Sequence, residues 1–166
     1  TNAASGEAYG WVTSPDASNW YFTQDITSRD SVYSEDYTAH FHESSVITLF
    51  DNNHKQVGSF SVKVPEGWKH VTDITPYGPV TKKLFDRDEN SNEILVEFHD
   101  AFKGSNKYLT RAYDINTGEI KFEMEGTGLV FDASKGWDSY QRLIMTHESD
   151  EKYNQCSFWR GLRMGY

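Results

Sequence analysis

Residues 81–100 read TKKLFDRDENSNEILVEFHD, and this stretch decides the fold of the chain. Two apolar runs, at 84–85 and 94–96, flank a polar segment rich in carboxylates, as two strands flank the turn of a hairpin. The same layout of strand, aromatic–Asp pair, turn and strand occurs at 46–64 and at 108–124. The chain therefore contains three copies of one predicted β-hairpin pattern.

Strand signals continue on both sides of these hairpins, and we also predict strands over 71–74, ended by the prolines at 76 and 79, and over 129–131, 140–145 and 153–159. Phe60, Val62 and Val64 alternate with polar residues, as in a half-buried strand, whereas residues 46–50 are apolar on both faces, as in a central strand. Turn residues separate the strands at intervals of about 8–12 residues, and no segment of ordinary helix length has a 3.6-residue period. We predict an all-β fold: an antiparallel meander that closes as a barrel, a sandwich or a small propeller-like stack.

The beginning of the chain differs from the rest in composition, because residues 1–19 are mostly small or polar. We predict an extended N-terminal arm over 1–19, followed by a single all-β domain over 20–166. Within that domain, the polar segment 25–36 is predicted to be a surface loop. Residues 1–6 are typical of the exposed start of a processed chain, so we expect an extracellular or cell-surface location.

The composition disfavours several classes of partner. The 166 residues carry a formal net charge of −9 from 25 acidic and 16 basic residues, without any cluster of five or more Lys and Arg. Nucleic acid and anionic membrane both attract a basic surface, so neither is expected as a partner. Since the sequence has no run of 18 apolar residues, no membrane insertion is expected. The single cysteine excludes an internal disulfide, and the composition leaves the oligomeric state open.

The segments 80–88 and 93–96, together with 62–67 and the turn at 113–120, resemble the blade hairpins of secreted bacterial β-propeller-like surface proteins. In such proteins the strands are scaffold and the loops carry recognition, so the resemblance implies a surface-exposed binding protein. Stacked repeats usually need several copies to bury a continuous core. With three copies in this chain, closure as a small barrel or sandwich is the alternative to a propeller-like stack.

The carboxylates of the hairpin at 81–100 suggest a calcium site. Their spacing follows that of a helix–loop–helix calcium loop, in which alternate side chains supply oxygen ligands to one cation. However, Ser91 occupies the position that such a loop gives to glycine, and prolines precede the loop instead of a helix. The alternative, which we favour, is a solvated hairpin tip held by Asx turns. The candidate ligands are Asp86, Asp88, Asn90, Glu93 and Glu97.

The histidines suggest a second kind of metal site. His40 and His42 fall on one face of a predicted strand, which suits a first-row transition metal, and His70 follows in a Pro-x-Gly-x-x-His motif. Together the two motifs resemble those of cupins, and the resemblance implies a metal-dependent β-barrel enzyme. The glutamate of the first cupin motif is absent, because apolar residues occupy its place. The alternative is that His40 and His42 are ordinary surface-facing strand residues.

Aromatic residues make up 15% of the chain, and several fall in predicted loops or at strand ends. Exposed aromatic rings can stack on sugar rings or on the side chains of a partner. The alternative is that these rings close the ends of the core. The candidate binding residues are Trp11, Trp20, Tyr21, Trp68, Tyr77 and Trp137.

From these patterns we expect a non-catalytic, secreted or cell-surface module that recognises a protein partner or a glycan. A metal-dependent enzyme of cupin type is the first alternative, and a structural subunit of a surface assembly is the second. The expected module needs no cofactor. Calcium is the one cation that the loop at 86–97 could hold.

Overall fold

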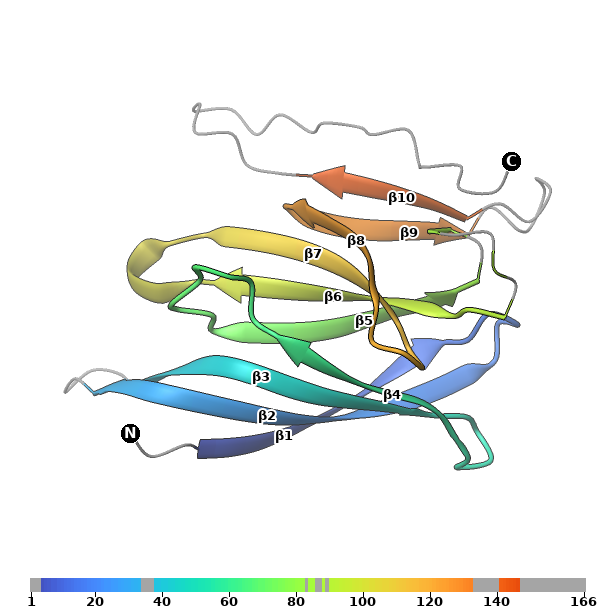
Figure 1. Cartoon of the computed structure of the whole chain (residues 1–166), viewed down its shortest axis with the longest axis horizontal. Helices are drawn as coiled ribbons and strands as arrows, with labels where there is room; N and C mark the ends of the chain where they lie inside the picture. Colours follow the sequence, from blue (N-terminus) through green and yellow to red (C-terminus); the bar gives the residue numbers. More distant parts are fainter. Residues whose placement is uncertain are drawn as a thin grey trace.

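The protein is built from three antiparallel β-sheets (Figure 1). The computed structural model describes residues 4–33, 38–82, 84–85, 88, 90–132 and 141–146. In the first sheet four strands pair in chain order. They are β1 (Ala4–Thr13), β2 (Asn19–Tyr33), β3 (Thr38–Phe50) and β4 (Gln56–Lys63).

The second sheet repeats this order with four further strands, and a separate pair of strands follows it. A short 3-10 turn, Phe102–Gly104, joins the second and third strands of the second sheet. The prediction of an antiparallel all-β fold is confirmed, and within the described part of the chain the sheets do not close into a barrel. The strands are β5 (Asp73–Thr81), β6 (Glu93–Asp100), β7 (Lys107–Asp114), β8 (Ile120–Glu125), β9 (Thr127–Asp132) and β10 (Gln141–Thr146).

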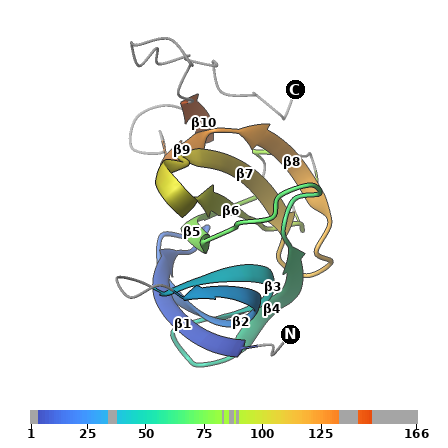
Figure 2. The same cartoon turned by 90° about the vertical axis from the view of Figure 1, so that its left-hand side faces the viewer.

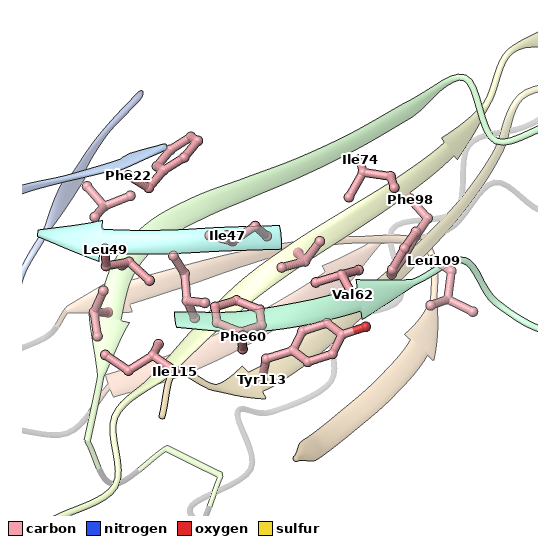
Figure 3. Packing of buried hydrophobic residues seen from close by; sticks show 14 of the residues in the cluster. Phe22, Ile47, Leu49, Phe60, Val62, Ile74, Phe98, Leu109, Tyr113 and Ile115 are labelled. Carbon is pink, nitrogen blue, oxygen red and sulfur yellow. The ribbon is translucent and has the colours of Figure 1, made fainter. Parts of the chain in front are cut away.

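The main hydrophobic core lies between the first and second sheets (Figure 3). Ile47 and Val62 of the first sheet and Val96 and Phe98 of the second are all fully buried in it. Most inward-facing positions of β1 to β4 are thus apolar, and they meet the apolar positions of β5 to β7; Gln24 and Ser45 are buried polar exceptions. This packing is the main source of stability, since burial of apolar surface is the dominant favourable term in folding.

A smaller cluster covers the opposite face of the second sheet. It joins Leu95 of β6 to Val130 of β9 and Leu143 of β10. Figure 2 shows the resulting order of layers, with the second sheet between the first sheet and the β9–β10 pair. Since successive side chains of a strand point to opposite faces, a middle sheet must be apolar on both. This explains the three consecutive buried residues at 94–96.

Polar contacts also join the first two sheets. The guanidinium of Arg111 on β7 donates from Nη1 to the carbonyl oxygen of Lys63 at the end of β4, at 2.7 Å, and to the hydroxyl of Tyr113 at 2.9 Å. Its Nε donates to Glu123 on β8, and its Cζ lies 4.9 Å from the centre of the Phe98 ring. Arg111 therefore connects β4, β7 and β8 at the margin of the main core.

Two of the three predicted hairpins are confirmed, whereas residues 84–85, predicted as a strand, follow the end of β5 at Thr81; the unit that repeats is also larger than a hairpin. Residues 46–64 and 108–124 form the third and fourth strands of their sheets, and their turns are alike: Asp51 and Asp114 each accept two backbone N–H groups. Residues 81–100 instead connect the first and second strands of the second sheet. The structural repeat is therefore a four-stranded sheet.

Three predictions about local structure are wrong. Residues 4–13 are not a separate arm, because they form β1 and pair with β2 along their whole length. Residues 25–33 are not a surface loop, because β2 continues through them. Residues 46–50 are buried on one face only, and Val46 remains 42% exposed. All three errors concern the first sheet, in which many outward positions are polar because its outer face has no covering layer among the described residues.

The prediction for the first strand of the second sheet is also wrong, because a strand over 71–74 was expected to end at Pro76. Instead β5 begins at Asp73 and continues through Pro76 and Pro79. It tolerates both because it is an edge strand, where a missing N–H need not interrupt a ladder. The strands predicted near 129–131 and 140–145 are present as β9 and β10. The strand predicted at 153–159 lies outside the described residues. Among the described residues, no helix is long and apolar enough to cross a membrane.

Candidate binding site

The outer face of the first sheet carries a row of aromatic side chains at one end. Trp11 of β1, Tyr21 of β2 and Phe50 of β3 are register partners, and their sequence neighbours point into the main core. The Tyr21 ring stacks on Phe50 with centroids 5.1 Å apart, and it meets the Trp11 ring edge-to-face at 5.7 Å. Directly opposed residues of paired strands lie about 5 Å apart, so the register itself assembles this row.

A groove of about 420 Å³ opens beside the row, and we call it the Trp11 groove. Trp11 and Tyr9 form its most exposed walls, with 74% and 72% of their surface accessible. Gly10 lies between them because the backbone passes directly over Phe22: a Cβ atom at Gly10 would lie 2.4 Å from that ring. The lining residues are Tyr9, Gly10, Trp11, Tyr21, Phe22 and His54.

The turn between β3 and β4 supplies a polar wall to the groove. Asp51 Oδ1 accepts the backbone N–H groups of Asn53 and Lys55 at 2.8 and 3.0 Å, and His54 adopts a left-handed conformation with φ of 63°. This geometry places His54 Nδ1 2.9 Å from the hydroxyl of Tyr21. The groove thus combines aromatic surface with a phenol and an imidazole that can exchange hydrogen bonds with a ligand.

Polar side chains cover the sheet face beyond the aromatic row. Tyr9 donates its hydroxyl to Glu7 Oε2 at 2.9 Å, and Glu7 lies opposite Asp25 in the register. The hydrogen bond to Glu7 is the main cause that raises the pKa of the Tyr9 phenol, and the charge of Asp25 adds to it. Thr48 and Ser59 exchange a hydroxyl hydrogen bond at 3.0 Å. The face therefore consists mostly of hydroxyls and carboxylates around one aromatic patch, with the exposed Val46 opposite Asp25 as an apolar exception.

The structure brings together only two of the aromatic residues predicted from the sequence, Trp11 and Tyr21. Trp20 and Trp68 pack against the main core instead. The ammonium of Lys107 lies 4.2 Å from the centre of the Trp68 ring. These two tryptophans therefore close the ends of the core, as the alternative interpretation expected.

The two remaining predicted aromatic residues, Tyr77 and Trp137, are not among the described residues that line the Trp11 groove. Tyr77 packs against the smaller cluster and donates its hydroxyl to the carbonyl oxygen of Gly128 at 2.8 Å, while burial raises its pKa to about 12. Trp137 lies outside the described residues. Tyr9, Phe50 and His54 were not predicted from the sequence to belong to a binding site. The spacing of Tyr9 and Trp11, two residues apart as on one face of a strand, was the available signal.

The predicted histidine site is not assembled among the described residues. His42 Nδ1 pairs with Ser28 Oγ at 2.7 Å. His70 instead packs its ring against Phe41, at 4.8 Å between centroids, and Phe41 is the buried residue between His40 and His42. Because neighbours on a strand face opposite sides, His70 lies on the other side of β3 from the pair. The cupin-like convergence of the three imidazoles is therefore absent from the described residues.

His42 is expected to make stability depend on pH. Burial lowers its pKa below 6.5, against the opposing charge of Asp73. The unfolded chain therefore binds this proton more tightly, and the stability that neutral His42 contributes is lost as the pH falls from about 6.5 through the lower folded pKa. Urea unfolding between pH 7.5 and pH 5 should show this loss, and His42→Gln should reduce the slope. An unchanged slope in His42→Gln would contradict this assignment.

The predicted calcium ligands are divided between surface and interior. Asp88 and Asn90 are exposed and form an Asx turn, with the Asn90 N–H 2.9 Å from Asp88 Oδ1. Glu93 is fully buried and accepts hydrogen bonds from Thr81 and Ser91 at 3.2 and 3.1 Å. Glu97, on β6, is half-buried, and burial raises its pKa. Asp86 lies outside the described residues, so the calcium interpretation remains a prediction.

No group of three or more His, Cys, Asp or Glu side chains in the described part of the chain is arranged to hold a metal ion. Comparison with known proteins gave no matching family model, no matching curated protein and no matching solved structure. The Trp11 groove is therefore the candidate binding site.

Proposed function

We propose that this protein is a non-catalytic binding module, secreted or held at a cell surface, that binds a glycan in the Trp11 groove. The observation that carries the proposal is the exposure of Trp11 and Tyr9, at 74% and 72%, beside a groove of about 420 Å³. Ligand sites are typically concave, lined by aromatic surface, and equipped with a few polar groups that orient the ligand.

The exposed rings of Trp11 and Tyr9 can contribute binding free energy when a ligand covers them. Covering one large aromatic side chain contributes on the order of 2 kcal/mol, because about 25 cal/mol is gained for each Å² of apolar surface removed from water. A pyranose ring has an apolar face that can lie on the Trp11 indole, and a rim of hydroxyls that can bond to Tyr21, His54 and the carboxylate of Glu7. The groove offers both kinds of contact within one short stretch of sheet.

The polar character of the surrounding face favours a glycan over another packed sheet. The second sheet, which is covered on both sides, presents apolar residues to both of its neighbours. The outer face of the first sheet instead presents Thr23, Asp25, Thr48 and Ser59 next to the aromatic row. A protein layer over this face would leave hydroxyls and carboxylates without water, which is costly unless each one is paired.

Among a barrel, a sandwich and a propeller-like stack, we propose the stack as the finer description of the fold. Two four-stranded sheets, each a meander in chain order, lie face to face. The antiparallel β9–β10 pair packs on the opposite face of the second sheet as a third layer. In such a stack the strands are scaffold and the ligand binds at an exposed face or rim, as proposed for the Trp11 groove.

The test is retention on immobilised neutral polysaccharides, such as cellulose, mannan, xylan and mixed-linkage glucan. At least one should retain the protein, and Trp11→Ala should weaken that binding by at least about tenfold, as expected from the loss of on the order of 2 kcal/mol. The matched control is Leu129→Ala, which removes an apolar side chain that is 53% exposed on β9. It should bind like the wild type.

Two results would contradict the proposal. One is full retention of binding by Trp11→Ala. The other is the absence of binding to every polysaccharide, together with a self-association in sedimentation that Trp11→Ala abolishes. That second outcome would assign the groove to contacts between copies of the chain, as in a structural subunit.

A further inference from the structure

We infer that the Trp11 groove selects uncharged glycans and rejects those that carry carboxylate or sulfate groups, through a pair of carboxylates beside the aromatic walls. This inference rests on the proposed glycan binding and specifies the class of ligand. The two carboxylates belong to Glu7 on β1 and Asp25 on β2, which are direct register partners.

The position of the pair follows from the strand register and from one hydrogen bond. Both carboxylates are exposed on the outer face of the first sheet, two register positions beyond Tyr9 and Thr23. Glu7 accepts the Tyr9 hydroxyl at 2.9 Å, which fixes it next to the most exposed wall of the groove. The charge of Asp25 also reaches the Tyr9 phenol, since it helps to raise the pKa of that group. A ligand lying against Tyr9 therefore meets two negative charges.

The Glu7–Asp25 pair is expected to lower the stability of the first sheet. Like charges directly opposite each other on paired strands are destabilising, whereas opposite charges or hydroxyl pairs are favourable. The same face contains hydroxyl pairs elsewhere, such as Thr48 with Ser59, so a neutral pair is compatible with this surface. Residues that break a local rule tend to do so at functional sites, where the cost is offset by what they recognise.

The two cations of the first sheet whose side chains the structure describes, Lys55 and Lys63, lie away from this pair. Lys63 is the last residue of β4, opposite Ser44, and β4 is three strands away from β1 in the sheet order. Lys55 lies in the β3–β4 turn beside His54, at the other end of the aromatic row. Among the side chains that the structure describes, the charged groups next to Tyr9 are therefore negative, in a chain whose net charge is −9.

Electrostatics then separates two classes of glycan. Hydroxyl groups can donate to the Glu7 and Asp25 oxygens, and hydrogen bonds to a charged acceptor are stronger than those to a neutral one. A uronate or sulfate in the same position would add a like charge at short range, and such juxtapositions are a general means of rejecting wrong partners. Because the carboxylates are exposed, salt should weaken the rejection.

The experiment compares ligands that differ at one group: neutral gluco- and manno-oligosaccharides and their C6-oxidised counterparts, in which a carboxylate replaces the primary alcohol. The readout is the ratio of the two dissociation constants. For the wild type this ratio should favour the neutral form by at least about tenfold at low salt and should shrink at high salt. In the double variant Glu7→Gln/Asp25→Asn the ratio should fall severalfold toward unity.

Gln and Asn keep the shape and an acceptor oxygen, and a thermal melt of the double variant checks that the sheet still folds. The matched control is Glu125→Gln, which neutralises an exposed carboxylate on β8 and should leave the ratio unchanged. Equal binding of both ligands by the wild type would overturn the charge selection and leave glycan binding intact. A ratio that the double variant does not change would overturn the role of this pair. Neutral binding that is insensitive to Trp11→Ala would instead overturn the proposed function.

Discussion

Phe98→Ala is expected to lower the free energy of unfolding by about 3–5 kcal/mol, the usual cost of truncating a buried Phe. Phe98 is fully buried on β6, where the first and second sheets meet (Figure 3). The substitution removes the ring from the main core and leaves a cavity that the two rigid sheets can only partly close. It also removes the ring that faces the Arg111 guanidinium at 4.9 Å.

Urea unfolding at neutral pH measures this loss, with Leu129→Ala as the control. Leu129 is 53% exposed, and substitutions at such surface positions usually change stability by less than about 0.5 kcal/mol. A loss below about 1 kcal/mol for Phe98→Ala would be incompatible with a core shared by the two sheets.

The second large effect is expected from Leu95→Ala, at about 2–5 kcal/mol. Leu95 precedes Val96 on β6 and points to the opposite face, where it is 2% exposed and packs with Val130 and Leu143. In a sheet covered on one side, this position would face water and its truncation would cost little. A large loss in Leu95→Ala therefore tests whether the β9–β10 pair covers the second sheet.

The two variants are most informative together. Comparable losses in Phe98→Ala and Leu95→Ala, each well above that of Leu129→Ala, are expected only when both faces of β6 are buried. If Leu95→Ala costs as little as Leu129→Ala, the β9–β10 pair does not form a third layer in solution, and the stacked arrangement has to be abandoned.

Local chemistry made the hairpins predictable. Asp51 and Asp114 follow an aromatic strand residue and precede turn-forming residues, so each could be expected to fold back on its own backbone, as both do. Alternation at Phe60 and Val62 likewise identified the inner face of β4, where both are buried. These features depend on neighbours in sequence, and sequence patterns report them directly.

Features that depend on which faces of a sheet are covered could not be predicted from the sequence. The polar residues of 25–33 are typical of a loop, yet they form a strand because β3 supplies partners along this segment and β1 supplies them as far as Ser28. The site was only partly predictable for the same reason. Trp11 and Tyr21 were identified as candidates, but only the register between β1, β2 and β3 places them beside Phe50 and His54.

The exposure of the other aromatic candidates could not be read from sequence either. Trp20, Trp68 and Tyr77 stand near turns or strand ends, as Trp11 does, yet each packs against a cluster of buried residues. Which ring remains exposed is decided by the packing of whole sheets, since the outer face of the first sheet has no covering layer among the described residues.

Glycan binding in the Trp11 groove can be observed by recording amide and indole N–H resonances during titration with a neutral oligosaccharide from the retention assay. We expect saturable shifts at the Trp11 indole N–H and at the amides of Tyr9, Tyr21 and His54, with the second sheet unaffected. Saturable binding with shifts confined to the second sheet or to the β9–β10 pair, and a Trp11 resonance that does not move, would contradict binding in this groove.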